Sequence, residues 1–138
     1  MNQPTPQLKP SASILLIDDH PLLRRGVKQL IDLDPALQVI AEASDAQSGL
    51  EQAQQHQPDL ILLDLNMRHI NGIESLKLMR AAGVNCFIIV FTVSDDEEDL
   101  LAALKAGADG YLLKDMEPED LLDKLHQAAH GKVVISDQ

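Results

Sequence analysis

The sequence predicts an α/β fold, a doubly wound five-stranded parallel sheet in which each strand is followed by a helix, (βα)5. Two observations predict it. Five short apolar runs are spread along the 138 residues, and the segments between them carry apolar residues at helical spacing. Because strand–helix–strand crossovers are right-handed, this alternation gives an open parallel sheet with helices on both faces.

The five apolar runs are the expected strands. Four of them are apolar throughout, as strands buried on both faces of a sheet should be. The second run carries the charged Glu42 and is therefore expected at an edge of the sheet. The runs are residues 14–17, 39–43, 60–63, 87–91 and 111–113.

The first helix is predicted from its apolar spacing and from two prolines. Leu23, Val27 and Leu30 recur at i, i+4 and i+7, so they define one buried face. Pro21 suits a first helical turn, and the Asp-Pro pair at 34–35 ends the helix.

The later helices are predicted from caps and spacing. Residues 94–97, Ser-Asp-Asp-Glu, have the form of a capping box that begins the fourth helix. Leu121, Leu125 and Ala128 give the last helix a buried face. Helices should end at three glycines, Gly83, Gly107 and Gly131.

The length suits a single globular domain and is too short for two ordinary ones. Residues 1–12 are polar and proline-bearing, lack the order of a signal peptide, and are expected to form a flexible tail. The domain should occupy residues 13–131. Residues 132–138 are expected to begin a linker to a segment outside this chain.

Charge and cysteine content limit the function classes. Lys and Arg number 11 against 22 Asp and Glu, so the net charge of −11 disfavours direct binding to nucleic acid or to an anionic membrane. No apolar run approaches the roughly 20 residues of a membrane span. The lone Cys86 is expected as a reduced core thiol, which indicates a cytoplasmic protein.

Polar residues follow the predicted strands, at the edge where α/β sheets carry their function. Asp18 and Asp19 follow the first strand, Asp64 the third, Thr92 the fourth and Lys114 the fifth. Adjacent carboxylates repel, so a cation should compensate them. Without metal, carboxylates so grouped should have a raised pKa.

The residue types at this edge predict phosphoryl chemistry. Oxygen ligands without histidine or thiolate favour a hard cation, and we expect Mg²⁺ or Mn²⁺. Asp64 could act as a carboxylate nucleophile that forms an acyl phosphate. Thr92 and Lys114 could then bind the phosphoryl oxygens.

This pattern resembles the receiver domain of bacterial two-component response regulators. Its sequence is similar to the NarL/LuxR-type branch, including nitrate/nitrite-type regulators. The resemblance implies the flavodoxin-like strand order 2-1-3-4-5. Its carriers are "LLIDDHP", "LILLDLNM", "VFTVS" and "GADGYLLKD", in the order and spacing of the family.

By this resemblance Asp64 is the phospho-acceptor, and Asp19 and Asp64 bind the metal with the main-chain carbonyl of Asn66. Asp18 acts through water. Lys114 pairs with the phosphoryl group and Thr92 bonds to it. Tyr111 matches the aromatic residue whose ring follows that threonine inward.

The resemblance also implies partners. The phosphoryl group would come from a sensor histidine kinase, and a C-terminal helix-turn-helix DNA-binding domain would lie outside this chain. Such regulators control transcription and can form homodimers. The domain would catalyse its own phosphotransfer and slow dephosphorylation without being an enzyme for an external substrate.

Other readings of the same residues remain open. The domain could dock proteins while its acceptor chemistry is idle, although the acidic pair and Lys114 argue against this. A haloacid-dehalogenase-like phosphatase would need a second aspartate where Asn66 stands. A flavin mononucleotide binder would need a glycine- and hydroxyl-rich loop in place of "DDHP".

Two positions depart from the family pattern. Arg68 replaces a usual proline, and Asp115 follows Lys114 where many receivers have a proline. Three histidines are predicted to have no chemical role: His20 as part of a helix start, and His126 and His130 on a solvated helix face.

Overall fold

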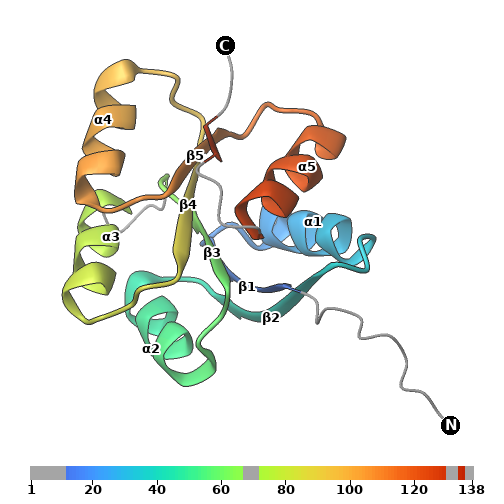
Figure 1. The fold of residues 1–138 in the computed structure, drawn as a ribbon, viewed down its shortest axis with the longest axis horizontal. Coiled ribbons are helices and arrows are strands. Elements are labelled where there is room, and N and C mark those ends of the chain that lie inside the picture. The colour runs from blue at the N-terminus through green and yellow to red at the C-terminus, as the bar shows by residue number, and fades with distance from the viewer. Residues whose placement is uncertain (1–11, 67–71, 130–133, 136–138) are drawn as a thin grey trace, which may run out of the picture.

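The computed structural model describes residues 12–66, 72–129 and 134–135. Strands and helices alternate along the chain as predicted (Figure 1). The strands are β1 (Ala12–Ile17), β2 (Leu37–Ala43), β3 (Leu60–Asp64), β4 (Phe87–Thr92), β5 (Gly110–Leu113) and β6 (Val134–Ile135). The helices are α1 (Pro21–Asp32), α2 (Ala46–His56), α3 (Gly72–Ala81), α4 (Glu97–Ala106) and α5 (Pro118–Ala129).

The sheet is parallel and has the order β2-β1-β3-β4-β5-β6. The expected order of the five main strands is therefore confirmed, as is the edge position of β2. The sequence did not predict β6, whose Val134 pairs with Gly110 and whose Ile135 pairs with Tyr111. This short strand falls within the residues expected to begin a linker.

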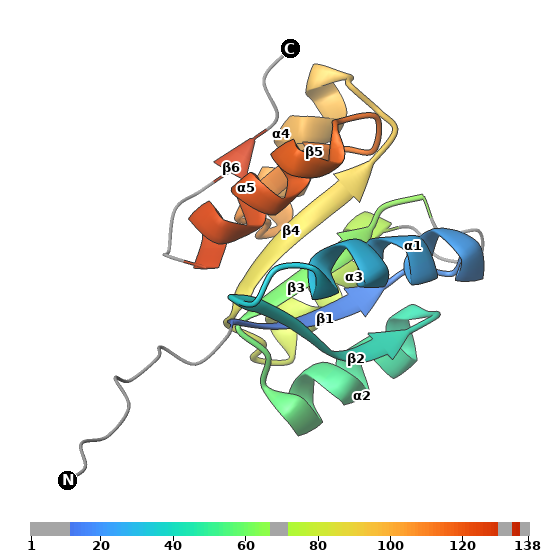
Figure 2. The ribbon, with the colours of Figure 1, turned by 90° about the vertical axis from the view of Figure 1, so that its right-hand side faces the viewer.

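Helices cover both faces of the sheet (Figures 1 and 2). On one face α1 and α5 bury Val27, Ile31 and Leu125 against the even-numbered strand residues of β1 and β3. On the other face α2, α3 and α4 pack on the alternate residues of the same strands. Because β1, β3, β4 and β5 are covered on both sides, their residues are apolar nearly throughout.

The first helix follows its predicted pattern closely. It begins at Pro21, buries Val27 and Ile31, and packs Leu23 and Leu30 partly against the core. It ends at Asp32, and the Asp34 carboxylate accepts a hydrogen bond from the Ala36 amide at 2.9 Å. In α5 the three predicted core residues, Leu121, Leu125 and Ala128, are buried.

The predicted capping box at the start of α4 is wrong. The N-cap is Asp96, whose carboxylate accepts from the Glu98 amide at 3.2 Å, so the helix begins two residues later than a Ser94 cap would place it. The Ser94 hydroxyl instead donates to Asp99 at 2.6 Å, and the Ser94 amide donates to the Thr92 hydroxyl at 3.1 Å. Ser94 is therefore part of the strand end.

Two of the predicted glycine ends are confirmed. Gly83 and Gly107 have φ values of 90° and 112°, in the left-handed region that favours glycine. The side chain of Arg80 holds the second of these ends. Its Nη2 donates to the Gly107 carbonyl at 2.7 Å and lies 2.8 Å from Asp109, and its Nη1 donates to the Cys86 carbonyl at 2.9 Å. One guanidinium thus joins the end of α3 to the end of α4 and the start of β4, an arrangement we call the Arg80 clamp.

His126 is partly exposed, which agrees with the expected helix face, and its Nε2 also contacts the Asp34 carboxylate beyond the end of α1. The Lys114–Asp115 peptide bond is trans. Arg68, His130 and Gly131 lie outside the described residues. Within the described part of the chain, none of the helices is long and apolar enough to cross a membrane.

Candidate functional site

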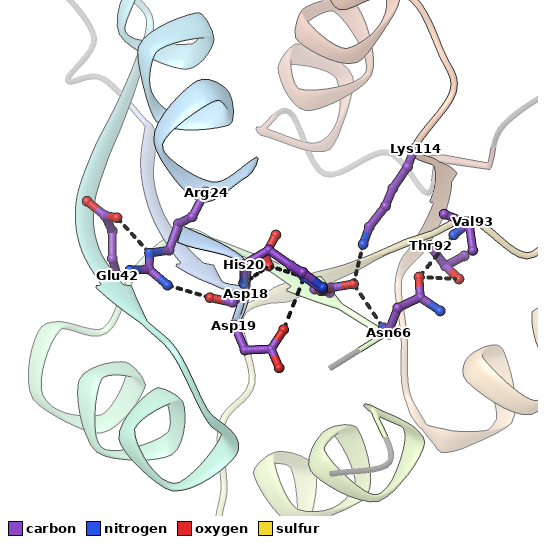
Figure 3. A network of polar contacts seen from close by, with 10 residues as sticks. Asp18, Asp19, His20, Arg24, Glu42, Asn66, Thr92, Val93 and Lys114 are labelled. Atoms are coloured by element: carbon purple, nitrogen blue, oxygen red, sulfur yellow. Dashed lines mark hydrogen bonds and ion pairs between the residues drawn. The ribbon is translucent and has the colours of Figure 1, made fainter. Parts of the chain in front are cut away.

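The carboxyl ends of four strands meet at one edge of the sheet. Leu63 is in register with Ile17, Asp64 with Phe91, and Thr92 with Leu113. Each predicted polar residue ends its strand or directly follows it, so the sheet brings all of them to this edge (Figure 3). The expected gathering of Asp18, Asp19, Asp64, Thr92 and Lys114 is what the structure has.

Asp64 lies at the centre of the site and is 2% exposed. Its Oδ1 lies 2.6 Å from the Lys114 Nζ and accepts a hydrogen bond from the Asn66 amide at 2.8 Å. Its Oδ2 accepts no hydrogen bond from any described residue. The two carboxylate oxygens therefore have different surroundings, one cationic and one facing the acidic pair.

Asp18 is buried beside Asp64. Burial raises its pKa, and the negative charge of Asp64 raises it further, while the hydrogen bond from the His20 amide at 2.7 Å opposes the shift. The raised pKa predicted for the grouped carboxylates is thus found at Asp18. Its main-chain carbonyl accepts from the Arg24 Nη1 at 2.6 Å, and Arg24 also pairs with Glu42 of β2 at 3.0 Å.

His20 was not predicted to belong to the site, yet its ring lies among the carboxylates. Its Nδ1 is 3.1 Å from Asp18 Oδ1, 3.1 Å from Asp19 Oδ1 and 3.4 Å from Asp64 Oδ2. In Figure 3 the His20 ring and the Lys114 amino group converge on the middle of the site. Its position in the sequence could have indicated this. His20 follows the acidic pair and is the N-cap residue of α1, so it lies beside the strand ends.

Asn66 links the end of β3 to the end of β4. Its Oδ1 accepts hydrogen bonds from the Thr92 hydroxyl at 3.3 Å and from the Val93 amide at 3.1 Å. The resemblance assigned a role only to its main-chain carbonyl. The side chain therefore has a contact that sequence reasoning missed, and this contact occupies the hydroxyl of Thr92.

Tyr111 is buried, with its ring directed inward from β5. Its hydroxyl donates to the Ser94 carbonyl at 2.9 Å, and burial raises the pKa of the phenol. Because Ser94 also donates its amide to the Thr92 hydroxyl at 3.1 Å, Tyr111 and Thr92 are connected through one residue.

The donor set fits a divalent cation. Asp18, Asp19, His20 and Asp64 each offer one ligand atom, and these atoms all lie within 4.8 Å of one another. The buried Oδ2 of Asp64, without a hydrogen bond from the described residues, is an atom that a cation would satisfy. His20 adds a nitrogen to the oxygen ligands that were expected, and which of these atoms hold an ion stays a prediction.

Comparison with known proteins identifies the family. The family model of the response regulator receiver domain matches residues 14–126. The chain is 60% identical over 126 residues to the nitrate/nitrite response regulator protein NarL of Escherichia coli K12, covering 91% of this chain and 58% of that protein. It is 50% identical over 124 residues to a nitrate/nitrite response regulator protein homolog of Haemophilus influenzae, covering 90% and 60%. The chain thus spans about three-fifths of the length of these curated relatives.

Solved structures show the same architecture. A LuxR-family two-component response regulator from Aurantimonas superposes with a TM-score of 0.86 at 32% identity, covering 91% of this chain and 90% of that one. A CheY-like receiver domain protein from Methanospirillum hungatei gives a TM-score of 0.77 at 26% identity, covering 88% and 95%. The strand-end carboxylates, the sheet order and the family match agree, and this chain belongs to the response regulator receiver domain family, in its NarL/NarP-type branch.

Proposed function

We propose that this chain is a phosphorylation-controlled receiver of the nitrate/nitrite type, in which Asp64 accepts a phosphoryl group from a sensor histidine kinase. The observation that carries the proposal is the environment of Asp64. Its buried carboxylate ends β3 with Oδ1 held by Lys114 at 2.6 Å and Oδ2 directed toward the acidic pair. A carboxylate held between a cation and a cation site is oriented for attack on a phosphate.

The transfer is a nucleophilic substitution at phosphorus. A carboxylate oxygen of Asp64 attacks the phosphorus of a phosphohistidine on the kinase, so that a P–O bond forms as the P–N bond breaks. The electron pair of the broken bond stays on the imidazole, which takes up a proton from water. Later attack by water on the acyl phosphate restores the Asp64 carboxylate and releases inorganic phosphate.

Asp19, Asp64 and the main-chain carbonyl of Asn66 would hold Mg²⁺ or Mn²⁺, and Asp18 would act through water. When bound, the divalent ion supplies positive charge that offsets the repulsion between the carboxylates and the phosphoryl oxygens. Lys114 supplies a second positive charge from the opposite side, at the Asp64 Oδ1. Burial raises the pKa of Asp18 and the charge of Asp64 adds to the shift, so a bound cation would favour the charged form of this carboxyl.

Thr92 and Tyr111 would transmit the change. The Thr92 hydroxyl donates to Asn66 Oδ1, so it has to leave this acceptor before it can donate to a phosphoryl oxygen. The Ser94 amide donates a hydrogen bond to the same Thr92 hydroxyl, and the Tyr111 hydroxyl donates one to the Ser94 carbonyl. A movement of Thr92 would therefore shift the segment that leads to α4, and with it the hydrogen bond of the buried Tyr111.

The output would be control of transcription. The curated relative from Escherichia coli is about 1.7 times as long as the segment matched to it, because that segment covers 58% of its length. This agrees with a helix-turn-helix DNA-binding domain outside this chain. The net charge of −11 agrees with a domain that does not itself bind nucleic acid or anionic membrane. As a receiver it would work in the cytoplasm. Homodimerisation on phosphorylation would couple the receiver to DNA.

Incubation with Mg²⁺ and acetyl phosphate, followed by intact-protein mass spectrometry, tests the proposal. The native chain should gain the mass of one phosphoryl group in a Mg²⁺-dependent reaction, and Asp64→Asn should not. Asp123→Asn, which removes an exposed carboxylate on α5, is the matched control and should react like the native chain. A phosphopeptide that maps to another residue would refute the assignment of Asp64.

A further inference from the structure

We propose that His20 is a ligand of the divalent ion through its Nδ1, and that this nitrogen shifts the preference of the site from Mg²⁺ toward Mn²⁺. The inference rests on the proposed function, because it concerns the ion that would serve Asp64. It goes beyond that function by adding a ligand of a different element to a site otherwise made of oxygen.

The position of the ring is the first support. His20 is the N-cap residue of α1, but its side chain makes no capping hydrogen bond to the helix. The ring lies toward the carboxylates, with Nδ1 at 3.1 Å from Asp18 Oδ1 and from Asp19 Oδ1 and at 3.4 Å from Asp64 Oδ2. The side chain is 42% exposed, so the ring can adjust without disturbing the core.

These separations match the edges of an octahedron. With metal–ligand bonds of about 2.1 Å, neighbouring ligands lie about 3.0 Å apart and opposite ligands about 4.2 Å apart. The three Nδ1–oxygen distances are close to the neighbouring value, and one ligand atom from each of the four residues lies within 4.8 Å of all the others. Nδ1 thus stands where a ligand adjacent to the Asp19 and Asp64 oxygens would stand, and its 3.1 Å distance to Asp18 Oδ1 is that of a hydrogen bond.

An independent observation points to a cation in the same place. Asp64 Oδ2 is buried on a side chain that is 1% exposed and accepts no hydrogen bond from the described residues. Lys114 satisfies Oδ1 on the other side, at 2.6 Å, and does not compensate Oδ2. A buried charged oxygen without such a bond is costly, and a metal ion shared with His20 would satisfy it.

Ligand chemistry then determines which ion is preferred. Mg²⁺ takes oxygen ligands and dehydrates reluctantly. Mn²⁺ also accepts carboxylates, but it is a first-row transition ion that binds at N/O sites, so an imidazole nitrogen adds more affinity for Mn²⁺ than for Mg²⁺. A site in which one imidazole joins the oxygen ligands of Asp19, Asp64 and Asn66 should therefore gain affinity for Mn²⁺ that it does not gain for Mg²⁺.

Pulsed electron paramagnetic resonance of the Mn²⁺-loaded protein is a direct test, because a coordinated imidazole gives nitrogen modulation that changes when ¹⁴N is replaced by ¹⁵N. The native chain should show this modulation. His20→Asn, which places a shorter amide side chain near the Nδ1 position, should lose the imidazole signal and still bind the ion. His56→Ala, which removes an exposed histidine at the end of α2, is the matched control and should retain the signal.

Affinities measured by titration provide the second readout. His20→Ala should raise the Mn²⁺ dissociation constant about tenfold and the Mg²⁺ constant by less than about threefold. Absence of imidazole modulation in the native chain would overturn the inference. So would tighter Mg²⁺ binding together with unchanged Mn²⁺ binding in His20→Ala, since the ring would then only compete with the ion for the carboxylates.

These outcomes are distinct from failure of the proposed function. Phosphorylation of Asp64 in the presence of Mg²⁺ can proceed whether or not imidazole is coordinated. If Mn²⁺ binds with nitrogen modulation while Asp64 gains no phosphoryl group, the His20 inference stands and the acceptor assignment fails.

Discussion

Among single residues, Lys114 offers a way to separate phosphorylation of Asp64 from the conformational change that should follow it. The Lys114 side chain is 12% exposed and its Nζ is 2.6 Å from Asp64 Oδ1, so it acts on the acceptor from within the protein. A lysine in this position can follow the phosphoryl group once the carboxylate is phosphorylated, because the negative charge then moves outward.

Lys114→Ala should still be phosphorylated on Asp64, more slowly than the native chain, but should fail to change conformation. The measurement is the difference in ¹H–¹⁵N spectra with and without beryllofluoride and Mg²⁺. Lys77→Ala, which removes an exposed lysine on α3, should respond like the native chain. If the Lys114 variant showed spectral changes as large as the native ones, Lys114 would not be the coupling residue.

Cys86 illustrates how burial sets reactivity. Partial burial raises the pKa of its thiol from 9.0 to about 11, so the expectation of an inert reduced thiol agrees with its surroundings. At pH 8 the native thiol should react with Ellman's reagent about 100-fold more slowly than the unfolded chain, because two pKa units remove that share of thiolate.

The same shift gives a pH dependence of stability. Since the folded state holds the Cys86 proton more tightly, its contribution to stability is complete below pH 9 and is lost as the pH rises through about 11. Equal thiol reaction rates in buffer and in urea at pH 8 would contradict the raised pKa. Cys86→Ser, which has no thiol, gives the background rate.

At the level of secondary structure, two glycines test how far helix geometry determines stability. Gly26 lies within α1, is exposed, and has open space where a Cβ would be. Gly83 follows α3 and also has open space, but its φ is 90°. The same substitution should therefore have opposite effects at the two positions.

Gly26→Ala should raise the free energy of unfolding by about 0.5–1 kcal/mol, because alanine loses less conformational freedom in a helix. Gly83→Ala should lower it by about 1–2 kcal/mol, because a side chain is strained at positive φ. Urea denaturation measures both. A Gly83→Ala variant as stable as the native chain would show that the turn relaxes to a different backbone conformation.

The strands and the helix starts differ in how well sequence predicts them. The strands were predicted because burial on both faces leaves a continuous apolar run, as in "LILL" at 60–63. The start of α4 was not, because Ser94 and Asp96 are both good caps and the choice depends on the partners of Ser94. Those partners, Thr92 and Asp99, are set by the folded strand end.

The site itself was largely predictable because parallel strands end at one edge. Asp18, Asp64 and Lys114 needed only the strand boundaries to be placed together. His20 was missed because the direction of an N-cap side chain depends on what lies beneath it. The contact between His126 and Asp34 joins residues 92 positions apart, and no local pattern indicates it.

At the scale of the whole molecule, we expect the stability of the fold to depend on whether a cation offsets its negative charge. The chain carries a net charge of −11, and three of its carboxylates, those of Asp18, Asp19 and Asp64, gather at the site. We expect Mg²⁺ to bind the folded site only, and therefore to raise the melting temperature by several degrees. At a hundredfold excess over the dissociation constant, the gain is about 2.7 kcal/mol.

Asp19→Ala should lose most of this stabilisation, whereas Asp95→Ala, which removes an exposed carboxylate near the start of α4, should keep it. Differential scanning calorimetry with and without Mg²⁺, at constant ionic strength, measures the difference. If both variants gained as much as the native chain, the ion would bind elsewhere on the acidic surface.

The Arg80 clamp holds the C-terminal end of α4, so a movement of this helix would be largest at its N-terminal end. The guanidinium bonds hold the Gly107 carbonyl at 2.7 and 3.0 Å, while the opposite end of α4 adjoins the connection that contains Thr92 and Ser94. A ten-residue helix is about 15 Å long, so a displacement of about 1 Å at the free end corresponds to a tilt of roughly 4° about Arg80. The exposed Leu101, near mid-span, would then travel about half as far as the tip.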